Sequence, residues 1–297
     1  MKLPTTKATE EQLMDYIRHI RQVIDEALPP GAVVPQHTAD GHFYGVPSGG
    51  VYPSVTGKLG HIKDESIQNF AMNSALKYIE EHMHETIVDG QVDLIKAIEL
   101  FDEAKKTPSG LLHAAGDIGS KIHDRREEYF QAWIDSDQVD RPNIRTFIRE
   151  DDDKRLVACM LGLDKFLFET NYIPIRCEVM VYSDKYNIAG MLDDIGIMKH
   201  NGKWVLTLMD LKTSNQMKAH YWLQVAMYHM MFRDLTGLKP KRNIICKVNK
   251  DYPEYKLEEL AGMPKLIKGA KSVLQTGEVM EFIKEQRKDL GKTVIKI

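Results

Sequence analysis

Three consecutive segments constrain the fold of this chain most, because they resemble neighbouring strands joined by tight turns. Residues 172–183, 188–198 and 203–211 are rich in Val, Ile, Leu, Met and Tyr. The breaks between them are the short polar turns Ser183-Asp184-Lys185 and His200-Asn201-Gly202. Short turns of this composition between apolar runs close β-hairpins. The pattern therefore predicts a meander of three antiparallel strands.

Charged side chains lie at corresponding positions of the second and third predicted strands. Asp210 and Lys212 are two residues apart, so their side chains share one face of a strand, while Leu211 points the opposite way and its backbone carbonyl stays near them. Asp193 on the preceding strand would add a second carboxylate. Oxygen ligands of this kind are those that Mg²⁺ or Mn²⁺ prefers. The sequence therefore predicts a small metal site with a lysine beside it.

A solvated strand edge is the competing interpretation of these charges, and it fits the segment poorly. Charged residues are normally exposed, but the strand around Asp210 is largely apolar, and a charge there needs a partner or a metal. Asp193 and Asp194 are adjacent and must face opposite sides of their strand, so only one can join Asp210. The spacing from Gly190 favours Asp193, which leaves Asp194 as a supporting or a surface carboxylate.

These residues, in this order, resemble the PD-(D/E)XK nuclease superfamily, and within it the RecB-like exonuclease branch. Four motifs of that branch carry the resemblance: G-x-x-x-H at Gly119/His123, G-x-x-D at Gly190/Asp193, D-x-K at Asp210/Lys212 and Q-x-x-x-Y at Gln224/Tyr228. Each motif alone is weak, but four in the correct order and spacing are specific. The third motif carries Asp where many members have Glu, so the metal geometry is expected to differ slightly.

The resemblance covers roughly residues 110–250 and implies a fold. We expect an α/β fold with a restriction-endonuclease-like core, in which helices flank a mixed central sheet that contains the three-strand antiparallel meander. Helical additions are expected before this core. Outside the meander, helices are expected over 10–28, 64–85, 92–106, 108–135, 149–170, 218–236 and 257–288, with a further strand over 242–249.

The resemblance also implies which residues form the site. An isolated histidine on a helix is usually a surface residue, but here the resemblance makes it a metal ligand. The implied metal ligands are His123, Asp193, Asp210 and the backbone carbonyl of Leu211. The implied catalytic residues are Asp193, Asp210, Lys212 and Glu178. The implied substrate-binding residues are Gln224, Tyr228, Ser54 and Thr56.

Two of these assignments, for Glu178 and for the pair Ser54 and Thr56, rest on weaker sequence evidence. Glu178 could bind a second metal or hold a water, and a surface acid at a strand end is an equally good interpretation of it. Ser54 and Thr56 belong to a P-S-V-T segment that resembles one in the mitochondrial genome maintenance exonuclease and in related phage proteins. Taken alone, that segment is only a turn with a pair of hydroxyls.

The function implied by the resemblance is hydrolysis of DNA by a divalent-metal-dependent exonuclease, in recombination, repair or replication, with phage enzymes among its relatives. The cofactor would be one or two Mg²⁺ or Mn²⁺ ions. The partners would be DNA and a single-strand annealing or other recombination protein. A structure-specific or flap endonuclease on the same core is the alternative. A DNA-binding protein with a decayed site is disfavoured, because every expected catalytic position is occupied.

Composition sets the remaining expectations. With 297 residues and 43% hydrophobic content, the chain can bury the core of one elaborated domain. We expect an N-terminal helical and loop region over 1–107, in which 31–62 form an extended loop. The catalytic core would follow over 108–250 and a C-terminal helical region over 251–297. The pair Thr107-Pro108 favours the start of a new helix at the border of the core.

Charge, cysteine count and hydropathy exclude other classes. Three cysteines cannot supply the four-cysteine iron–sulfur cluster that some RecB-like relatives carry. No apolar run approaches the roughly 20 residues that span a bilayer, so we expect a soluble, cytoplasmic protein without a membrane partner. A formal net charge of −3 is unusual for a protein that binds phosphates. Basic residues concentrate after residue 238, however, and a metal would neutralise part of the acidic excess.

Overall fold

The structure is a computed structural model that describes residues 4–5, 7–29, 31–38, 41–60, 65–137, 139–214 and 216–293. Its internal contacts divide the chain into two compact units. The larger unit joins Met1–His61 to Ile122–Ile297, and the smaller is Ile62–Lys121. The expectation of one elaborated domain stays a prediction, because compactness does not show whether a unit folds alone.

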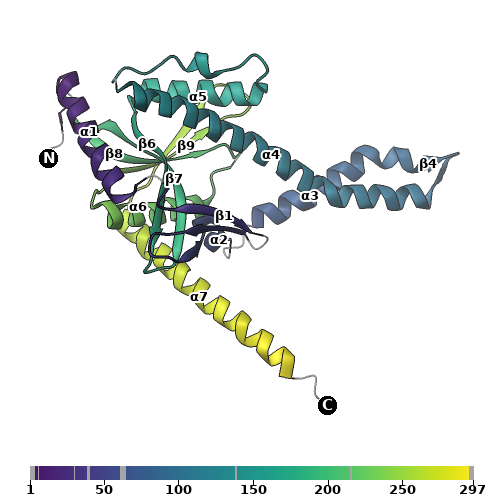
Figure 1. The fold of residues 1–297 in the computed structure, drawn as a ribbon. Coiled ribbons are helices and arrows are strands. Elements are labelled where there is room, and N and C mark those ends of the chain that lie inside the picture. The colour runs from purple at the N-terminus through teal and green to yellow at the C-terminus, as the bar shows by residue number, and fades with distance from the viewer. Residues whose placement is uncertain are drawn as a thin grey trace. The chain divides into compact units, whose positions relative to one another are not determined.

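A five-stranded mixed sheet forms the centre of the larger unit, with the strand order β10-β9-β8-β7-β6 (Figure 1). Its strands are β6 (Ile173–Ser183), β7 (Ile188–His200), β8 (Lys203–Lys212), β9 (Arg242–Val248) and β10 (Tyr255–Glu259). The first three are antiparallel neighbours, β9 runs parallel to β8, and β10 is antiparallel to β9. The predicted meander and the predicted α/β fold class are confirmed. The helix expected from residue 257 begins later, because 255–259 pair with β9 as a strand.

The strand register aligns three carboxylate positions across the meander. Cys177 of β6 pairs with Asp194 of β7, and Asp194 pairs with Met209 of β8. One step along each strand from this row, Glu178, Asp193 and Asp210 occupy corresponding positions. The sequence therefore places three acids side by side on neighbouring strands.

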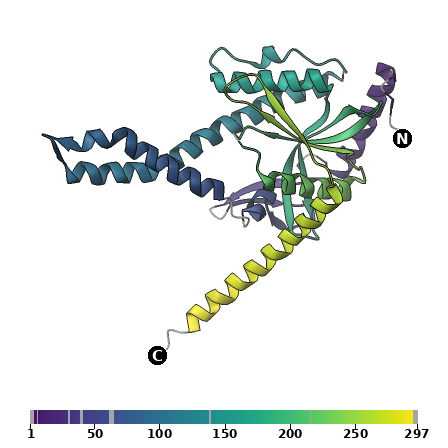
Figure 2. The same ribbon diagram turned by 180° about the vertical axis from the view of Figure 1, so that it is seen from behind.

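Helices cover both sides of this sheet (Figures 1 and 2). They are α1 (Glu10–Ala27), α5 (Lys154–Thr170), α6 (Ala219–Thr236) and the end of α4 (Leu94–Ser136), while α7 (Met263–Thr293) packs on α6. Phe130 of α4 and Phe166 of α5 both pack on the ring of Tyr172, just before β6. In contrast, α6 crosses the opposite side of the sheet and carries the chain from β8 to β9, the crossover that a parallel pair requires.

A small antiparallel sheet lies against β7, where the sequence predicted an extended loop over 31–62. Its strands are β1 (Val34–Thr38), β2 (Gly41–Gly45) and β3 (Val51–Pro53), followed by the short helix α2 (Val55–Leu59). Val33 and Val46 are buried against Ala189 of β7, and Ser54 forms a parallel bridge to the same residue. The loop prediction is wrong for 34–38, 41–45 and 51–53, because these strands are completed by a partner more than a hundred residues away in sequence.

The smaller unit contains α3 (Glu65–His82), the 3-10 turn η1 (Met83–Thr86), the hairpin β4 (Ile87–Val88) and β5 (Gln91–Val92), and the first part of α4. The predicted helix boundary at Thr107-Pro108 is wrong, since α4 continues through Pro108. Proline removes one backbone hydrogen bond from a helix interior. On either side of Pro108, two hydroxyls donate to backbone carbonyls of the helix. Thr107 donates to the Glu103 carbonyl at 3.1 Å, and Ser109 donates to the Lys106 carbonyl at 2.8 Å.

Among the described helices, none combines the length and the apolar composition that crossing a bilayer requires.

Candidate metal centre

Three of the predicted site residues meet where α4 passes β6 and β7. His123 of α4, Glu178 of β6 and Asp193 of β7 each offer one ligand atom, and these three atoms all lie within 4.8 Å of one another. The Nδ1 atom of His123 lies 3.8 Å from Oδ1 of Asp193. Such a spacing leaves room for a cation between the side chains, and the donor set of one imidazole with carboxylates suits Mg²⁺ or Mn²⁺.

Asp193 is fixed between two strands by a bond to the backbone. Its Oδ2 accepts a hydrogen bond from the Leu211 N–H at 2.6 Å. The pairing of β7 with β8 ends at Asp194 and Met209. The Asp193 carboxylate therefore accepts the Leu211 N–H just beyond the last paired residues. Leu211 is thus connected to the site through its N–H. A role for its carbonyl as a metal ligand stays a prediction.

Asp210 and Lys212 form a close ion pair at the end of β8. Nζ of Lys212 lies 2.6 Å from Oδ2 of Asp210, and the two side chains are 15% and 1% exposed. Among the described residues, Oδ1 of Asp210 has no hydrogen-bond partner. Buried acceptors without a donor cost free energy. Asp210 therefore keeps one buried oxygen, Oδ1, that a cation could bind.

Arg126 binds two carboxylates at the same place, one turn of α4 after His123. Its guanidinium donates to Asp194 of β7 and to Glu178 of β6. Arg126 and Asp194 are both fully buried, so the surface interpretation of Asp194 is wrong and the supporting one remains. Sequence reasoning missed Arg126, because an arginine on a helix is normally solvated. Its spacing of three residues from His123, which places both on one helix face, was the available signal.

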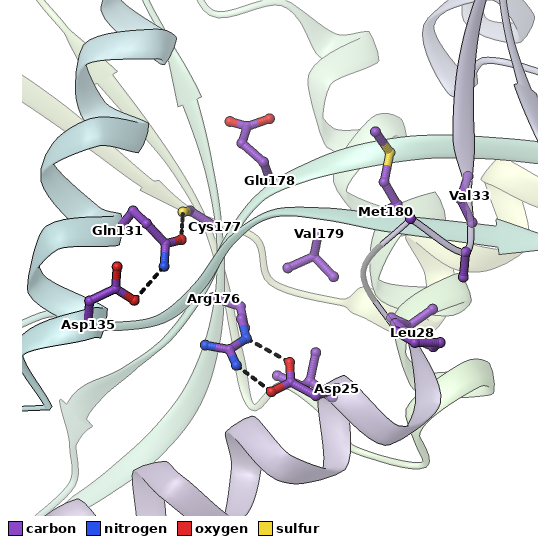
Figure 3. A pocket seen from close by; sticks show the side chains of 14 residues that line it. Asp25, Leu28, Val33, Gln131, Asp135, Arg176, Cys177, Glu178, Val179 and Met180 are labelled. Atoms are coloured by element: carbon purple, nitrogen blue, oxygen red, sulfur yellow. Dashed lines mark hydrogen bonds and ion pairs between the residues drawn. The ribbon is translucent and has the colours of Figure 1, made fainter.

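Glu178 lies in the middle of β6 and has an unusual backbone conformation. Its φ of 50° is in the left-handed region, which costs a residue other than glycine about 1–3 kcal/mol. Figure 3 shows its carboxylate pointing away from the Arg176–Asp25 ion pair, which lines a cavity of about 550 Å³ beside β6. Its side chain is 12% exposed. This position differs from that of a surface acid at a strand end, and its role toward a metal stays a prediction.

Burial changes the proton affinities of the carboxylates. Burial raises the pKa of Asp210 to about 7 against the opposing charge of Lys212, and it raises the pKa of Glu178 to about 8 against that of Arg126. Burial also opposes ionisation of Asp193, but His123, Arg126, Lys212 and the Leu211 N–H outweigh it, and the pKa of Asp193 is lowered. Asp193 is therefore the carboxylate that is already ionised at neutral pH.

The pKa values of His123 and Lys212 shift in opposite directions. Burial lowers the pKa of His123, despite the nearby charge of Asp193, and so favours the neutral imidazole that can bind a metal. Burial also disfavours the charged form of Lys212, but Asp210 and Asp193 outweigh it and raise the pKa of Lys212. Lys212 is therefore an ammonium at neutral pH, with N–H donors to offer.

Gln224 and Tyr228, predicted to bind substrate, lie together on α6. Nε2 of Gln224 donates to the Tyr228 hydroxyl at 3.2 Å, and both residues are largely buried. A Cβ on Gly190 would lie 2.9 Å from Cε1 of the Tyr228 ring, so this glycine lets Tyr228 rest on β7. Gly190 and Tyr228, which belong to two different motifs, are therefore neighbours in the fold.

The P-S-V-T segment reaches the same neighbourhood. The Cγ2 atom of Val55 lies 3.4 Å from the position of a Cβ on Gly190. Ser54 is buried and caps α2 by accepting the Gly57 N–H at 2.9 Å, while Thr56 is exposed and its hydroxyl lies 3.1 Å from that of Ser54. Sequence reasoning missed Tyr44 of β2. Burial raises the pKa of Tyr44 and the charge of Glu178 adds to this effect, so the tyrosine belongs to the surroundings of the site.

No protein-family model matches the sequence, and no curated protein matches it either. Among solved structures, the chain is similar to an alkaline exonuclease from Laribacter hongkongensis, with 13% identity and a TM-score of 0.31, over 45% of this chain and 70% of that one. The complex of that exonuclease with dAMP matches at 13% identity and a TM-score of 0.31, over 50% and 80% of the two chains. A protein from Eubacterium rectale described as a candidate exonuclease matches at 12% identity and a TM-score of 0.34. That match covers 54% of this chain and 64% of the other.

Stability should depend on pH through Asp210. Its pKa in the fold, about 7, exceeds its ordinary value of 3.8, so between these values the folded protein holds a proton that the unfolded chain releases. The free energy of unfolding that Asp210 contributes therefore falls as pH rises through this window. In urea titrations with EDTA, the wild type should lose stability between about pH 4 and about pH 7, and Asp210→Asn should reduce that slope by about one proton.

Asp234→Asn, which changes an exposed carboxylate on α6, is the control and should keep the wild-type slope. An identical pH dependence in Asp210→Asn and the wild type would show that Asp210 is ionised in the metal-free fold.

Proposed function

We propose that this protein is a divalent-metal-dependent deoxyribonuclease, and specifically an exonuclease that hydrolyses phosphodiester bonds of DNA with Mg²⁺ or Mn²⁺. The observation that carries the proposal is the cluster of His123, Glu178 and Asp193, whose ligand atoms all lie within 4.8 Å of one another. The buried Asp210 and its ion-pair partner Lys212 lie on the strand next to Asp193. The motif order, with each catalytic position occupied, supports the same conclusion.

The residues present fit a metal site. His123, Asp193, Asp210 and the Leu211 carbonyl would hold the ion, and Glu178 would add a carboxylate oxygen or bind a second ion. Neutral imidazole, carboxylates and a carbonyl are ligands that Mg²⁺ and Mn²⁺ accept. When bound, a divalent ion supplies Lewis-acid stabilisation of the charge that accumulates on the phosphate oxygens and makes water a better nucleophile.

Lys212 would stabilise the transition state as an ammonium. Its ion pair with Asp210 fixes the position of Nζ, and an ammonium has three N–H donors, so others remain for the attacking water or the pentavalent phosphate. This contact strengthens as negative charge builds up on the phosphate, which is the condition for lowering the barrier and not only for binding substrate.

The remaining predicted residues would position the DNA backbone. Thr56 is the exposed hydroxyl of the P-S-V-T segment, and Ser54 supports it through the contact between their hydroxyls. Gln224 and Tyr228 hold each other and are largely buried, so they would bound the site beside Gly190. Action in DNA recombination, repair or replication, and a single-strand annealing protein as partner, extend the proposal to the biological process.

Asp210→Asn should abolish most cleavage while DNA binding survives. The amide keeps the shape of the side chain but removes the charge that would bind the ion. We expect cleavage of end-labelled DNA to fall by about a hundredfold or more, since even partners of metal ligands cost 10–100-fold. Asp234→Asn on α6 should keep wild-type activity. Cleavage at the wild-type rate by Asp210→Asn would reject the assignment of the site.

Lys212→Ala should lower kcat and leave KM for DNA nearly unchanged, which is the signature of a lost transition-state interaction. Lys212→Arg should also fail, because a planar guanidinium does not replace a compact ammonium. Steady-state kinetics on linear DNA measures both constants, with the exposed Lys256→Ala as control. A rise in KM with kcat preserved would instead make Lys212 a phosphate-binding residue.

The requirement for a DNA end separates the proposed activity from its alternative. Linear single- and double-stranded DNA should be degraded with Mg²⁺ or Mn²⁺, short products should accumulate from the start, and covalently closed circles should be spared. Ca²⁺ should support binding without cleavage, because it is larger and has looser coordination geometry. Rapid linearisation of closed circles would identify an endonuclease. Binding of DNA and metal without cleavage of any substrate would identify a non-catalytic protein.

A further inference from the structure

We propose that Arg126 is a positioning residue of the metal centre, and that it holds the candidate ligands in place by joining three of the elements that carry them, α4, β6 and β7. Its partners lie on β6 and β7, and it projects from α4 beside His123. The inference rests on the proposed function only in requiring that the site takes a divalent cation.

The burial of Arg126 excludes direct contact with DNA. Its side chain is 0% exposed, so it cannot reach a phosphate from this position. Burying an unpaired guanidinium costs several kcal/mol of folding free energy. Here both terminal nitrogens of the guanidinium bind carboxylates inside the protein. Arg126 can therefore influence the reaction only through the groups that it holds.

Each contact of Arg126 is next to a candidate ligand. Glu178 is itself one of the three clustered ligand residues, and Arg126 binds its Oε1. Asp194, the other partner of Arg126, directly follows the candidate ligand Asp193 on β7. Groups that hydrogen-bond metal ligands fix their orientation and affect metal affinity.

Arg126 also lies among three carboxylates, Glu178 of β6 and Asp193 and Asp194 of β7. The charges of all three favour the protonated guanidinium and raise the pKa of Arg126. A lysine at this position would keep the positive charge but not the rigid planar fork that binds two carboxylates at once. Arg126→Lys therefore tests the geometry of the bridge and not only its charge.

The neighbouring Arg125 provides a matched control. It too is largely buried on α4, and it binds Asp152 through contacts of 2.6 and 3.0 Å and the Phe147 carbonyl at 2.5 Å. These partners contain no candidate metal ligand. Arg125→Lys should therefore disturb a buried arginine pair of the same helix without affecting the metal centre.

The test measures Mn²⁺ affinity directly, by electron paramagnetic resonance of free Mn²⁺ titrated into the full-length metal-free protein. Thermal unfolding of the same samples reports the structural effect. Both Arg126→Lys and Arg125→Lys should lower Tm. Only Arg126→Lys should raise Kd for Mn²⁺, by about 10–100-fold, as for other partners of metal ligands.

A second variant keeps the inference testable if Arg126→Lys does not fold. Asp194→Asn preserves the shape of the Arg126 partner and removes its charge, and it should also raise Kd for Mn²⁺. Unchanged Mn²⁺ affinity in Arg126→Lys or, failing that, in Asp194→Asn, together with a lowered Tm, would reduce Arg126 to a structural role and overturn the inference.

The outcomes also separate this inference from the proposed function. A wild-type protein that binds Mn²⁺ but cleaves no DNA would refute the nuclease, while the Mn²⁺ titrations would still decide the role of Arg126. A nuclease whose Arg126→Lys variant binds Mn²⁺ normally would refute the positioning role alone. A wild-type protein that binds no Mn²⁺ would overturn both.

Discussion

Carboxylates crowd together on three neighbouring strands of the central sheet, and two basic residues, Arg126 and Lys212, stabilise them there. Arg126 pairs with two of these acids, and Lys212 pairs with a third, Asp210. Charges cannot remain in such an interior without partners, so the strands, α4 and the end of β8 depend on these pairs for their relative positions. The pairs leave Oδ1 of Asp210 without a hydrogen-bond partner among the described residues. A divalent cation would satisfy this oxygen, which connects the stability of the fold to the chemistry that we propose for it.

The central part of the fold could be predicted from sequence because its signals are local. Apolar segments separated by polar turns specified β6, β7 and β8, and the helix expected over 218–236 is present as α6. The sheet of β1, β2 and β3 could not be found in this way, since Val33 and Val46 are buried only against Ala189, far along the chain. The local rule for proline also failed in α4, where hydroxyls next to Pro108 bind nearby carbonyls of the helix.

In the candidate site, too, local sequence signals predicted some residues, while those that depend on distant partners were missed. Alternation along a strand predicted that Asp210 and Lys212 lie together, and the structure has them in contact. Arg126 could not be found from composition, because only the tertiary fold shows that a helical arginine is surrounded by acids. The ion pair between Arg126 and Asp194 explains why Asp194 is buried, since the charge of Asp194 is compensated by a residue 68 positions away. Long-range electrostatic partners are therefore what sequence patterns leave out of this site.

Diffraction from crystals soaked in Mn²⁺, with data that locate manganese by its anomalous scattering, would show whether a divalent ion binds at this place. We expect an anomalous peak at about 2.0–2.3 Å from oxygens of Asp193 and Asp210, with His123 completing the site. The contact between Asp210 and Lys212 should lengthen as the ion takes the carboxylate. The absence of a peak among these residues at saturating Mn²⁺, in an otherwise unchanged site, would contradict the proposal of a metal centre.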